Sequence, residues 1–233
     1  MCGRYVSPDE ASIEREFNLV RTEWRFPPSY NVAPTQDVPV VRVGKDGVRG
    51  GTRGGTRMQW GLIPFWANGV QPKYSTINAT IEKLADGAAW RGPWKRGQRC
   101  AIPALGFYEW QVLPDGKTKQ PYYITLNDQE LFAFAGLWDS SAGVAGVIDS
   151  CTIVTLPANG LMTEIHNVRH RMPAILAKED RELWLAGPPE LAFGVLKQYP
   201  DTHMVATPVS KRVNTPKNND AQLIAPVAGA TPA

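Results

Sequence analysis

The stretch "RCAIPALGFYEWQVLPDGKTKQPYYITL", residues 99–126, decides the fold. Two runs rich in aromatic and β-branched residues flank an Asp115-Gly116 pair, which is typical of a tight turn. The stretch therefore predicts a β-hairpin. Runs of similar composition predict further strands at residues 38–43, 131–139, 150–157 and 203–210.

Short helices accompany these strands. In "SPDEASIEREF", Ser7 is expected to cap a helix that buries Ile13 and Phe17 on one face. Two more short helices are expected at residues 178–187 and 188–200. Because strands outnumber helices and connect by hairpins, we predict an α+β fold with a mainly antiparallel, barrel-like β-sheet core and short peripheral helices.

The composition is that of one globular domain: of 233 residues, 43% are hydrophobic and 20% are charged. We expect the domain to span residues 1–222 and a disordered tail to follow at 223–233. Three cysteines, an odd number, argue against a disulfide framework and favour the cytoplasm. No apolar run is long enough to span a bilayer, so no membrane partner is expected. A net charge of +3 restricts any nucleic-acid site to a local patch.

Cys2 directly follows the initiator methionine. Removal of Met1 would leave Cys2 with an α-amine beside its thiol, groups that titrate near pH ~8 and ~8.5. With an aldehyde, the amine forms an imine and the thiolate then closes a five-membered thiazolidine ring. The alternative is that Cys2 is merely a small residue in second position.

Glu109 is a carboxylate amid aromatic strand residues. Period-two alternation places it on one face with Phe107 and Gln111, so it either faces solvent or is held in a pocket. A pocket carboxylate suits proton transfer. Asn78 precedes a predicted helix and is either a functional residue or a capping residue.

The sequence has three histidines, His166, His170 and His203. His166 and His170 lie four residues apart in "TEIHNVRHRMP", a spacing that would place them on one helical face. Neither a C-x-x-C nor an H-E-x-x-H motif occurs, so no metal is expected. Cys100 and Cys151 lie in apolar strand patterns and are expected to be buried and inert.

Aromatic and basic side chains offer a possible nucleic-acid surface. Trp60 and Trp66 flank "GLIPF" and serve either the core or base stacking. Basic residues either form a phosphate-binding patch or are scattered over the surface: Arg4, Lys211, Arg212 and Lys217. The low-complexity "GKDGVRGGTRGGTR" is expected to be a flexible hairpin tip.

Eight segments in order resemble one family over nearly the whole chain. They are "MCGRY", "YNVAPTQ", "WGLIPFW", "INATIE", "GFYEWQ", "IVTLPAN", "IHNVRHRMPAIL" and "PVSKRVNTPKNND". This set resembles the SOS response-associated peptidase (SRAP) family, which includes sensors of abasic sites in single-stranded DNA. The resemblance implies a thiazolidine crosslink between Cys2, after Met1 removal, and the aldehyde of an abasic deoxyribose.

The resemblance also implies roles for individual residues. Glu109 would shuttle protons, Asn78 would position the N-terminal residue and the sugar, and a histidine of the Ile-His element would assist ring opening. It implies that further residues line the DNA groove: Arg4, Asn31, Pro34, Trp60, Trp66 and Thr155. To these we add Lys211 and Lys217 as expected phosphate contacts.

Three departures from the family pattern bear on these roles. The common form I-H-x-R-M-P is longer here, so both His166 and His170 are candidates, and we favour His166 because it keeps the Ile-His pair. Thr80 stands where an arginine phosphate contact is common. The Arg-Gly loop is longer than in the family pattern and would add a nonspecific electrostatic contact.

The expected protein is thus a cytoplasmic monomer that joins the nucleoid when bound to DNA, with single-stranded DNA as partner and no cofactor. Two other functions are open. One is a peptidase that uses Cys2 or Glu109 on substrates beyond its own N-terminus. The other is a noncovalent single-strand binding module whose tryptophans stack bases.

Overall fold

The computed structural model describes residues 2–19, 24–43 and 53–227. Five strands close a barrel, because β9 pairs back onto β10. In order around the barrel they are β10 (Gly146–Pro157), β4 (Arg53–Trp60), β3 (Asp37–Val43), β6 (Arg99–Ala104) and β9 (Phe132–Gly143). All of these pairings are antiparallel except β10 with β4.

Three short strands extend the barrel. Two of them pair with β10, namely β5 (Asn78–Thr80) and β11 (Arg171–Pro173). The third, β12 (Ile175–Leu176), pairs with β9. The pairing of β5 with β10 is parallel, so it comes from a crossover and not from a hairpin.

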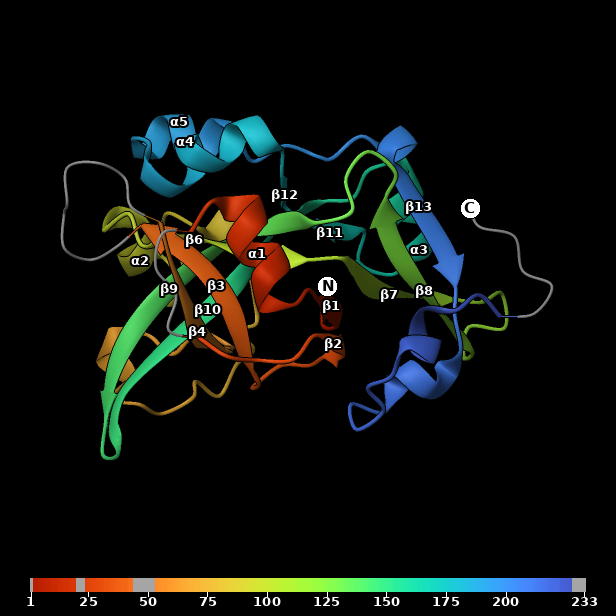
Figure 1. The fold of residues 1–233 in the computed structure, drawn as a ribbon, viewed down its shortest axis with the longest axis horizontal. Coiled ribbons are helices and arrows are strands. Elements are labelled where there is room, and N and C mark those ends of the chain that lie inside the picture. Colours follow the sequence, from red (N-terminus) through yellow and green to blue (C-terminus); the bar gives the residue numbers. More distant parts are fainter. Residues whose placement is uncertain (1, 20–23, 44–52, 228–233) are drawn as a thin grey trace.

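A second, antiparallel sheet packs beside the barrel (Figure 1). Its order is β13 (Met204–Pro208), β8 (Lys119–Leu126), β7 (Gly106–Val112), β1 (Tyr5–Ser7) and β2 (Ser29–Val32). The N-terminus enters where the two sheets meet, and β1 lies between β7 and β2. The predicted α+β, mainly antiparallel and barrel-like fold is confirmed.

The predicted hairpin is confirmed as β7 and β8, with Gly116 in the left-handed region at φ 67°. The run before the turn, however, is two strands. The chain breaks at Leu105, so that β6 stays in the barrel and β7 joins the second sheet. Gly106 permits this change, because a Cβ there would lie 2.3 Å from the Tyr123 ring.

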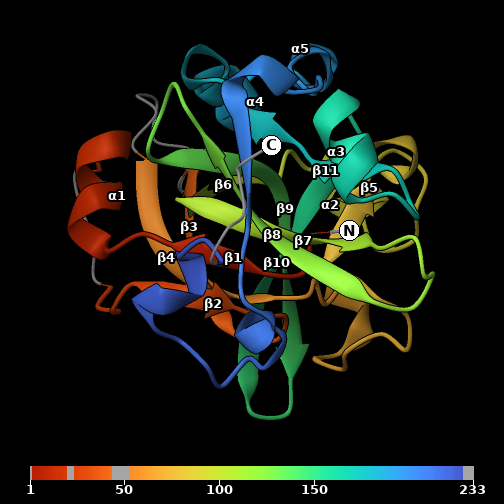
Figure 2. The ribbon, with the colours of Figure 1, turned by 90° about the vertical axis from the view of Figure 1, so that its right-hand side faces the viewer.

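The helices are short and lie at the periphery (Figures 1 and 2). They are α1 (Glu10–Phe17), α2 (Arg91–Lys95), α3 (Gly160–Ile165), α4 (Arg181–Ala186) and α5 (Pro189–Gly194). As predicted, α1 buries Ile13 and Phe17. Its cap is Asp9 and not Ser7, because Ser7 belongs to β1 while the Asp9 carboxylate accepts from Ser12 N at 2.9 Å.

The second half of the Arg-Gly repeat is strand and not a hairpin tip. Residues 53–57 pair with β3 along β4. Gly55 allows the Trp24 ring to pack on this strand, since a Cβ there would lie 2.6 Å from the ring. Residues 44–52, the rest of the expected tip, lie outside the described residues.

The packed chain continues beyond residue 222. Leu223 is fully buried, and Val227 N donates to Pro208 O at 3.0 Å. Residues 223–227 are therefore part of the folded domain, and only 228–233 of the expected tail lie outside the described residues.

Arg4 and Asn31 anchor the C-terminal segment 213–218 against β1 and β2. The Asn31 amide donates to Val213 O, Thr215 O and Asn218 O at 3.2, 3.1 and 2.8 Å. Its oxygen accepts from Arg4, which also donates to Val213 O at 2.8 Å. Because Asn31 is buried, its removal would take one donor from each of the three carbonyls and one acceptor from Arg4.

We expect Asn31→Ala to lower the free energy of unfolding by about 2 kcal/mol, because three hydrogen bonds to segment 213–218 and the bond from Arg4 are lost together. Urea unfolding monitored by tryptophan fluorescence measures this. Lys217→Ala is the control, because Lys217 is an exposed residue of the same segment 213–218. Its free energy of unfolding should stay within about 0.5 kcal/mol of that of the parent. Equal midpoints for the two variants would show that the anchor contributes no stability.

Candidate active site

Glu109 lies on the inward face of β7 and is 3% exposed. The alternation of the strand places Phe107 and Glu109 on the same buried face, so the solvated-face alternative is wrong. Burial disfavours the charged carboxylate and raises its pKa to about 7. Glu109 therefore exchanges its proton near neutral pH.

His166 faces Glu109 from the end of α3. Its Nε2 lies 4.0 Å from Glu109 Oε2. Its Nδ1 lies 2.9 Å from Arg171 O and 3.2 Å from Arg171 N, which fixes the ring. Burial lowers the pKa of His166 to about 4, so the imidazole is neutral at pH 7.

Asn78 comes from the barrel side. It is a residue of β5, opposite Ile153 of β10, and one 3-10 turn (Ile81–Lys83) follows this strand. The alternative role of Asn78 as a helix cap is therefore wrong. Asn78 Nδ2 donates to Cys2 O at 2.9 Å, while Oδ1 is buried with no hydrogen-bond partner among the described residues.

Cys2 is buried between these groups. Its thiol donates to Arg4 O, with Sγ 3.8 Å from the oxygen. Burial, and next the nearby Glu109 carboxylate, raise the pKa of the Cys2 thiol above its ordinary value. In this environment the thiol holds its proton at neutral pH.

The four side chains come from four separate parts of the chain and meet at the junction of the two sheets. Together they supply a protonated thiol, a carboxyl poised near pH 7, a neutral imidazole and an amide with a vacant acceptor. This set suits general acid–base chemistry around the backbone of Cys2.

His170 does not share this position. Helix α3 ends at Ile165, so His166 and His170 do not lie on one helical face as the spacing predicted. His170 has a positive φ of 49° and is exposed. The geometry thus brings His166, and not His170, to Glu109.

The model of the SOS response associated peptidase (SRAP) family matches residues 1–216. This chain belongs to the SRAP family. Abasic site processing protein YoqW of Bacillus subtilis is 39% identical over 234 residues, which cover 96% of this chain and 99% of YoqW. Abasic site processing protein HMCES of Xenopus tropicalis is 31% identical, over 97% of this chain and 78% of HMCES.

Solved structures share the fold. A crystal structure from Bordetella bronchiseptica, 26% identical, superposes with a TM-score of 0.76 over 90% of this chain and all of that chain. One from Bacteroides thetaiotaomicron, 23% identical, gives 0.82 over 97% of this chain and all of that chain. The SRAP fold is therefore confirmed by sequence and by structure.

Three of the residues expected to line a DNA groove are buried in the interior of the protein. Trp60 is fully buried, with Nε1 donating to Ile77 O at 2.9 Å. Thr155 is buried on β10, with Oγ1 3.5 Å from Ala79 O. Asn31 is held by the carbonyls of segment 213–218, as is the half-buried Arg4. In this structure these side chains contact protein groups, and their contacts with DNA stay a prediction.

The other expected DNA contacts are more accessible. Trp66 is 48% exposed, Lys211 and Lys217 are exposed, and Pro34 is half-buried. Phe65, which sequence reasoning missed, is 55% exposed beside Trp66 in the 3-10 turn Phe65–Ala67. The available signal was the adjacent aromatic pair that follows Pro64.

Arg171 is a second residue that sequence reasoning passed over. Its backbone holds the His166 ring, while its guanidinium pairs with both Glu82 oxygens at 2.7 and 3.1 Å. Thr80 ends β5 close by and is half-buried. The "RMP" motif pointed to this arginine, but its partner lies 89 residues away.

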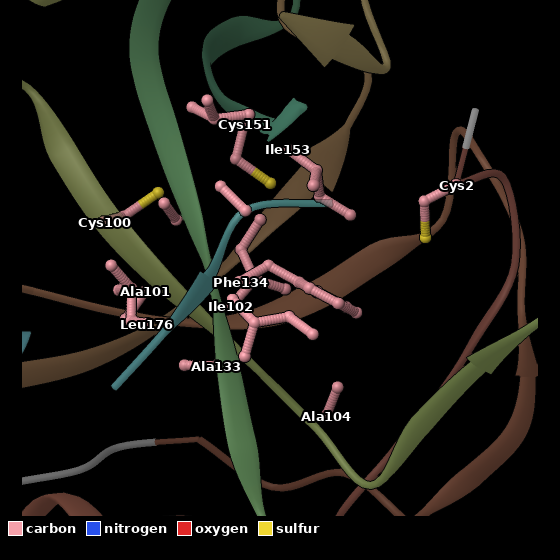
Figure 3. Close-up of a cluster of buried hydrophobic side chains, with 14 of the residues drawn as sticks. Cys2, Cys100, Ala101, Ile102, Ala104, Ala133, Phe134, Cys151, Ile153 and Leu176 are labelled. Atoms are coloured by element: carbon pink, nitrogen blue, oxygen red, sulfur yellow. The ribbon is translucent and has the colours of Figure 1, made fainter. Parts of the chain in front are cut away.

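The remaining cysteines are buried and away from Cys2, as Figure 3 shows. Burial raises the pKa of both thiols, so Cys100 and Cys151 are the inert thiols that were predicted. Among residues 2–19, 24–43 and 53–227, no group of three or more histidine, cysteine, aspartate or glutamate side chains is placed to hold a metal ion. Within that same part of the chain, no helix has the length and apolar character to cross a membrane.

The site predicts opposite pH effects on folding from its two titrating residues. Between pH 4.5 and 7, folded Glu109 keeps a proton that the unfolded chain has lost, so its contribution to stability falls as pH rises. Between pH 4 and 6.5, folded His166 lacks a proton that the unfolded chain binds, so its contribution rises. The two slopes oppose each other over the shared window.

Substitution of Glu109 or His166 should therefore leave only the pH dependence of stability that the other residue contributes. We expect the unfolding free energy of Glu109→Gln to rise by on the order of 2 kcal/mol from pH 4 to 6.5, and that of His166→Gln to fall similarly from pH 4.5 to 7. Urea unfolding at a series of pH values, compared with the parent, measures both. Parallel profiles for the two variants would contradict the assigned shifts.

Proposed function

We propose that this SRAP protein forms a covalent thiazolidine crosslink with abasic sites in single-stranded DNA, through Cys2 after removal of Met1. The observation that supports this best is the buried meeting of Cys2, Asn78, Glu109 and His166. The names of the YoqW and HMCES relatives, which describe abasic site processing, agree with it.

The first step would be hydrolysis of the Met1–Cys2 peptide bond. Glu109 lies close enough to act electrostatically on Cys2, and a carboxyl with a pKa near 7 can take a proton from water and return it to the leaving amine. Asn78 holds the Cys2 carbonyl during this change. The product is a free α-amine on Cys2.

The amine then attacks the aldehyde carbon of the ring-opened deoxyribose. A C–N bond forms, the aldehyde oxygen takes two protons and leaves as water, and an imine remains. Glu109 would supply and accept these protons. The neutral His166 would assist opening of the sugar ring, and the vacant Asn78 Oδ1 would accept from the new amine or from a sugar hydroxyl.

The thiol closes the ring in the last step. Its sulfur adds to the imine carbon, a C–S bond forms, and the thiol proton passes to the nitrogen. A positive charge on the neighbouring amine or imine favours the thiolate, which offsets the rise in pKa that burial causes. The overall change is amine, thiol and aldehyde to thiazolidine and water.

Intact mass spectrometry tests the proposal. Protein lacking Met1, incubated with a single-stranded oligonucleotide bearing one abasic site, should gain the oligonucleotide mass less one water, and the adduct should survive denaturation without borohydride. Cys2→Ser should lose the stable adduct, because an oxygen nucleophile closes the ring poorly. Cys100→Ser, a buried thiol elsewhere, is the matched control and should crosslink as the parent does.

Other results point to other functions. An adduct that requires borohydride would indicate a transient imine and lyase chemistry. Turnover of added peptides without an adduct would favour the peptidase, and binding of intact single strands without an adduct would favour a noncovalent module. Equal crosslinking by Cys2→Ala would overturn the thiazolidine.

Surface substitutions test the accompanying DNA contacts. Lys217→Ala should weaken binding to single strands and reduce the slope of log affinity against log salt by about 0.7, one phosphate's worth. Trp66→Ala should cost about tenfold in affinity with an unchanged slope, because stacking releases no counterions. Fluorescence anisotropy measures both, and Lys197→Ala, which pairs with Asp180 instead, is the control. A Lys217→Ala slope equal to that of the parent would remove this lysine from the interface.

A further inference from the structure

Asn167, the residue after His166, is joined directly to the strand that carries Glu109. Its Nδ2 donates to Val112 O at 2.8 Å, and its Oδ1 accepts from Val112 N at 3.0 Å. The side-chain amide thus makes both hydrogen bonds that a neighbouring strand would make with Val112. This reciprocal pair fixes both the position and the orientation of the turn after His166.

A second contact supports the same connection. Gln111 Nε2 donates to Glu164 O of α3 at 3.1 Å, and Gln111 Oε1 accepts from Tyr122. Two successive residues of β7 therefore hold the end of α3 and the turn that follows it. Both lie on the strand just beyond Glu109, within about 10 Å along the chain.

Other hydrogen bonds hold His166 to α3 and to β11. Its backbone N donates to Met162 O at 2.8 Å, which fixes it to α3, and Arg171 fixes its Nδ1. Neither partner is a residue of β7. The bonds that Asn167 and Gln111 make connect the His166 turn and α3 to the strand of Glu109.

We propose that Asn167 is a positioning residue that sets the separation of His166 Nε2 and Glu109 Oε2 by joining the His166 turn to β7. The proposal rests on the proposed function for its kinetic test, and on the site geometry alone for its spectroscopic test. Asn167 would not touch the DNA or the reacting atoms. It would act by keeping the carboxyl and the imidazole close together and free of water.

Loss of the two Asn167–Val112 hydrogen bonds has a defined consequence for Glu109 and His166. Burial is the main cause of the perturbed pKa of Glu109 and of His166, so admitting water moves both toward their ordinary values. The charges that act on His166 are first that of the N-terminal amine and then those of Arg169 and His170, of which only the last two belong to its own turn. A shift of both pKa values toward their ordinary values therefore reports the entry of water between the His166 turn and β7, since burial is the first cause of each.

The first experiment is NMR of the ring nitrogens of His166 across pH 3 to 8 in the parent and in Asn167→Ala. We expect the titration midpoint of His166 to rise by about one pH unit in the variant. This readout needs no DNA, so it stands even if the parent forms no crosslink. An unchanged midpoint in folded Asn167→Ala would overturn the proposal.

The second experiment is the pH dependence of crosslinking rate. Asn167→Ala should crosslink about tenfold more slowly at neutral pH. In its plot of crosslinking rate against pH, the limb that reports ionisation of Glu109 should move to lower pH. Gln111→Ala should shift this limb in the same direction by less, because it removes a single exposed bond to α3, besides the bond from Tyr122 within the sheet. It is the variant to use if Asn167→Ala does not fold.

Asn127→Ala is the matched control. Asn127 also uses its amide to bond a backbone carbonyl of another element, Thr202 O at 3.1 Å, but far along the chain from the site residues. We expect Asn127→Ala to lose some stability and to keep the parent's dependence of crosslinking rate on pH. If Asn167→Ala and Asn127→Ala lower the melting temperature equally and neither moves the profile, Asn167 is only a structural contact.

Discussion

The hydrogen bonding of β10 to four other strands is the constraint on which the site depends. β10 closes the barrel against β9 and β4, and its C-terminal half pairs with β5 and β11. Asn78 is therefore held by β5, one neighbour of β10. The Arg171 backbone that holds His166 belongs to β11, another neighbour. Since strand pairing fixes position to within a residue, both side chains have little freedom to move relative to the barrel.

The second sheet brings the remaining groups to that edge of the barrel. β1 lies against β7, so the chain that begins at Cys2 runs beside the strand that carries Glu109. Arg4 reinforces the arrangement, because its side chain holds segment 213–218 while its carbonyl oxygen accepts from Tyr108 N and from the Cys2 thiol. The N-terminus, usually the loosest part of a domain, is thus held on both sides.

Electrostatics in this junction follow from exclusion of water. Glu109 and His166 share an environment that disfavours charge on either residue, because transfer of a proton from the neutral carboxyl to the neutral imidazole would create a buried pair of ions. A solvent-exposed pair would have ordinary pKa values and could not combine a protonated carboxyl with a neutral imidazole near pH 7. Burial, more than the identity of either residue, therefore sets the protonation states of the pair and brings the pKa of Glu109 near neutral pH.

The sequence by itself determined the class of fold, the hairpin around Asp115 and Gly116, the burial of Cys100 and Cys151, and the candidate set at Cys2, Asn78, Glu109 and His166. These follow from local patterns and from motifs whose residues stand next to one another. Tertiary structure alone decided that Trp60, Thr155 and Asn31 face inward, that His166 and not His170 meets Glu109, and that Asn167 joins β7. The physical reason is that these outcomes depend on contacts between residues tens of positions apart, where the closing of the barrel and the packing of the second sheet choose which face of each element is covered.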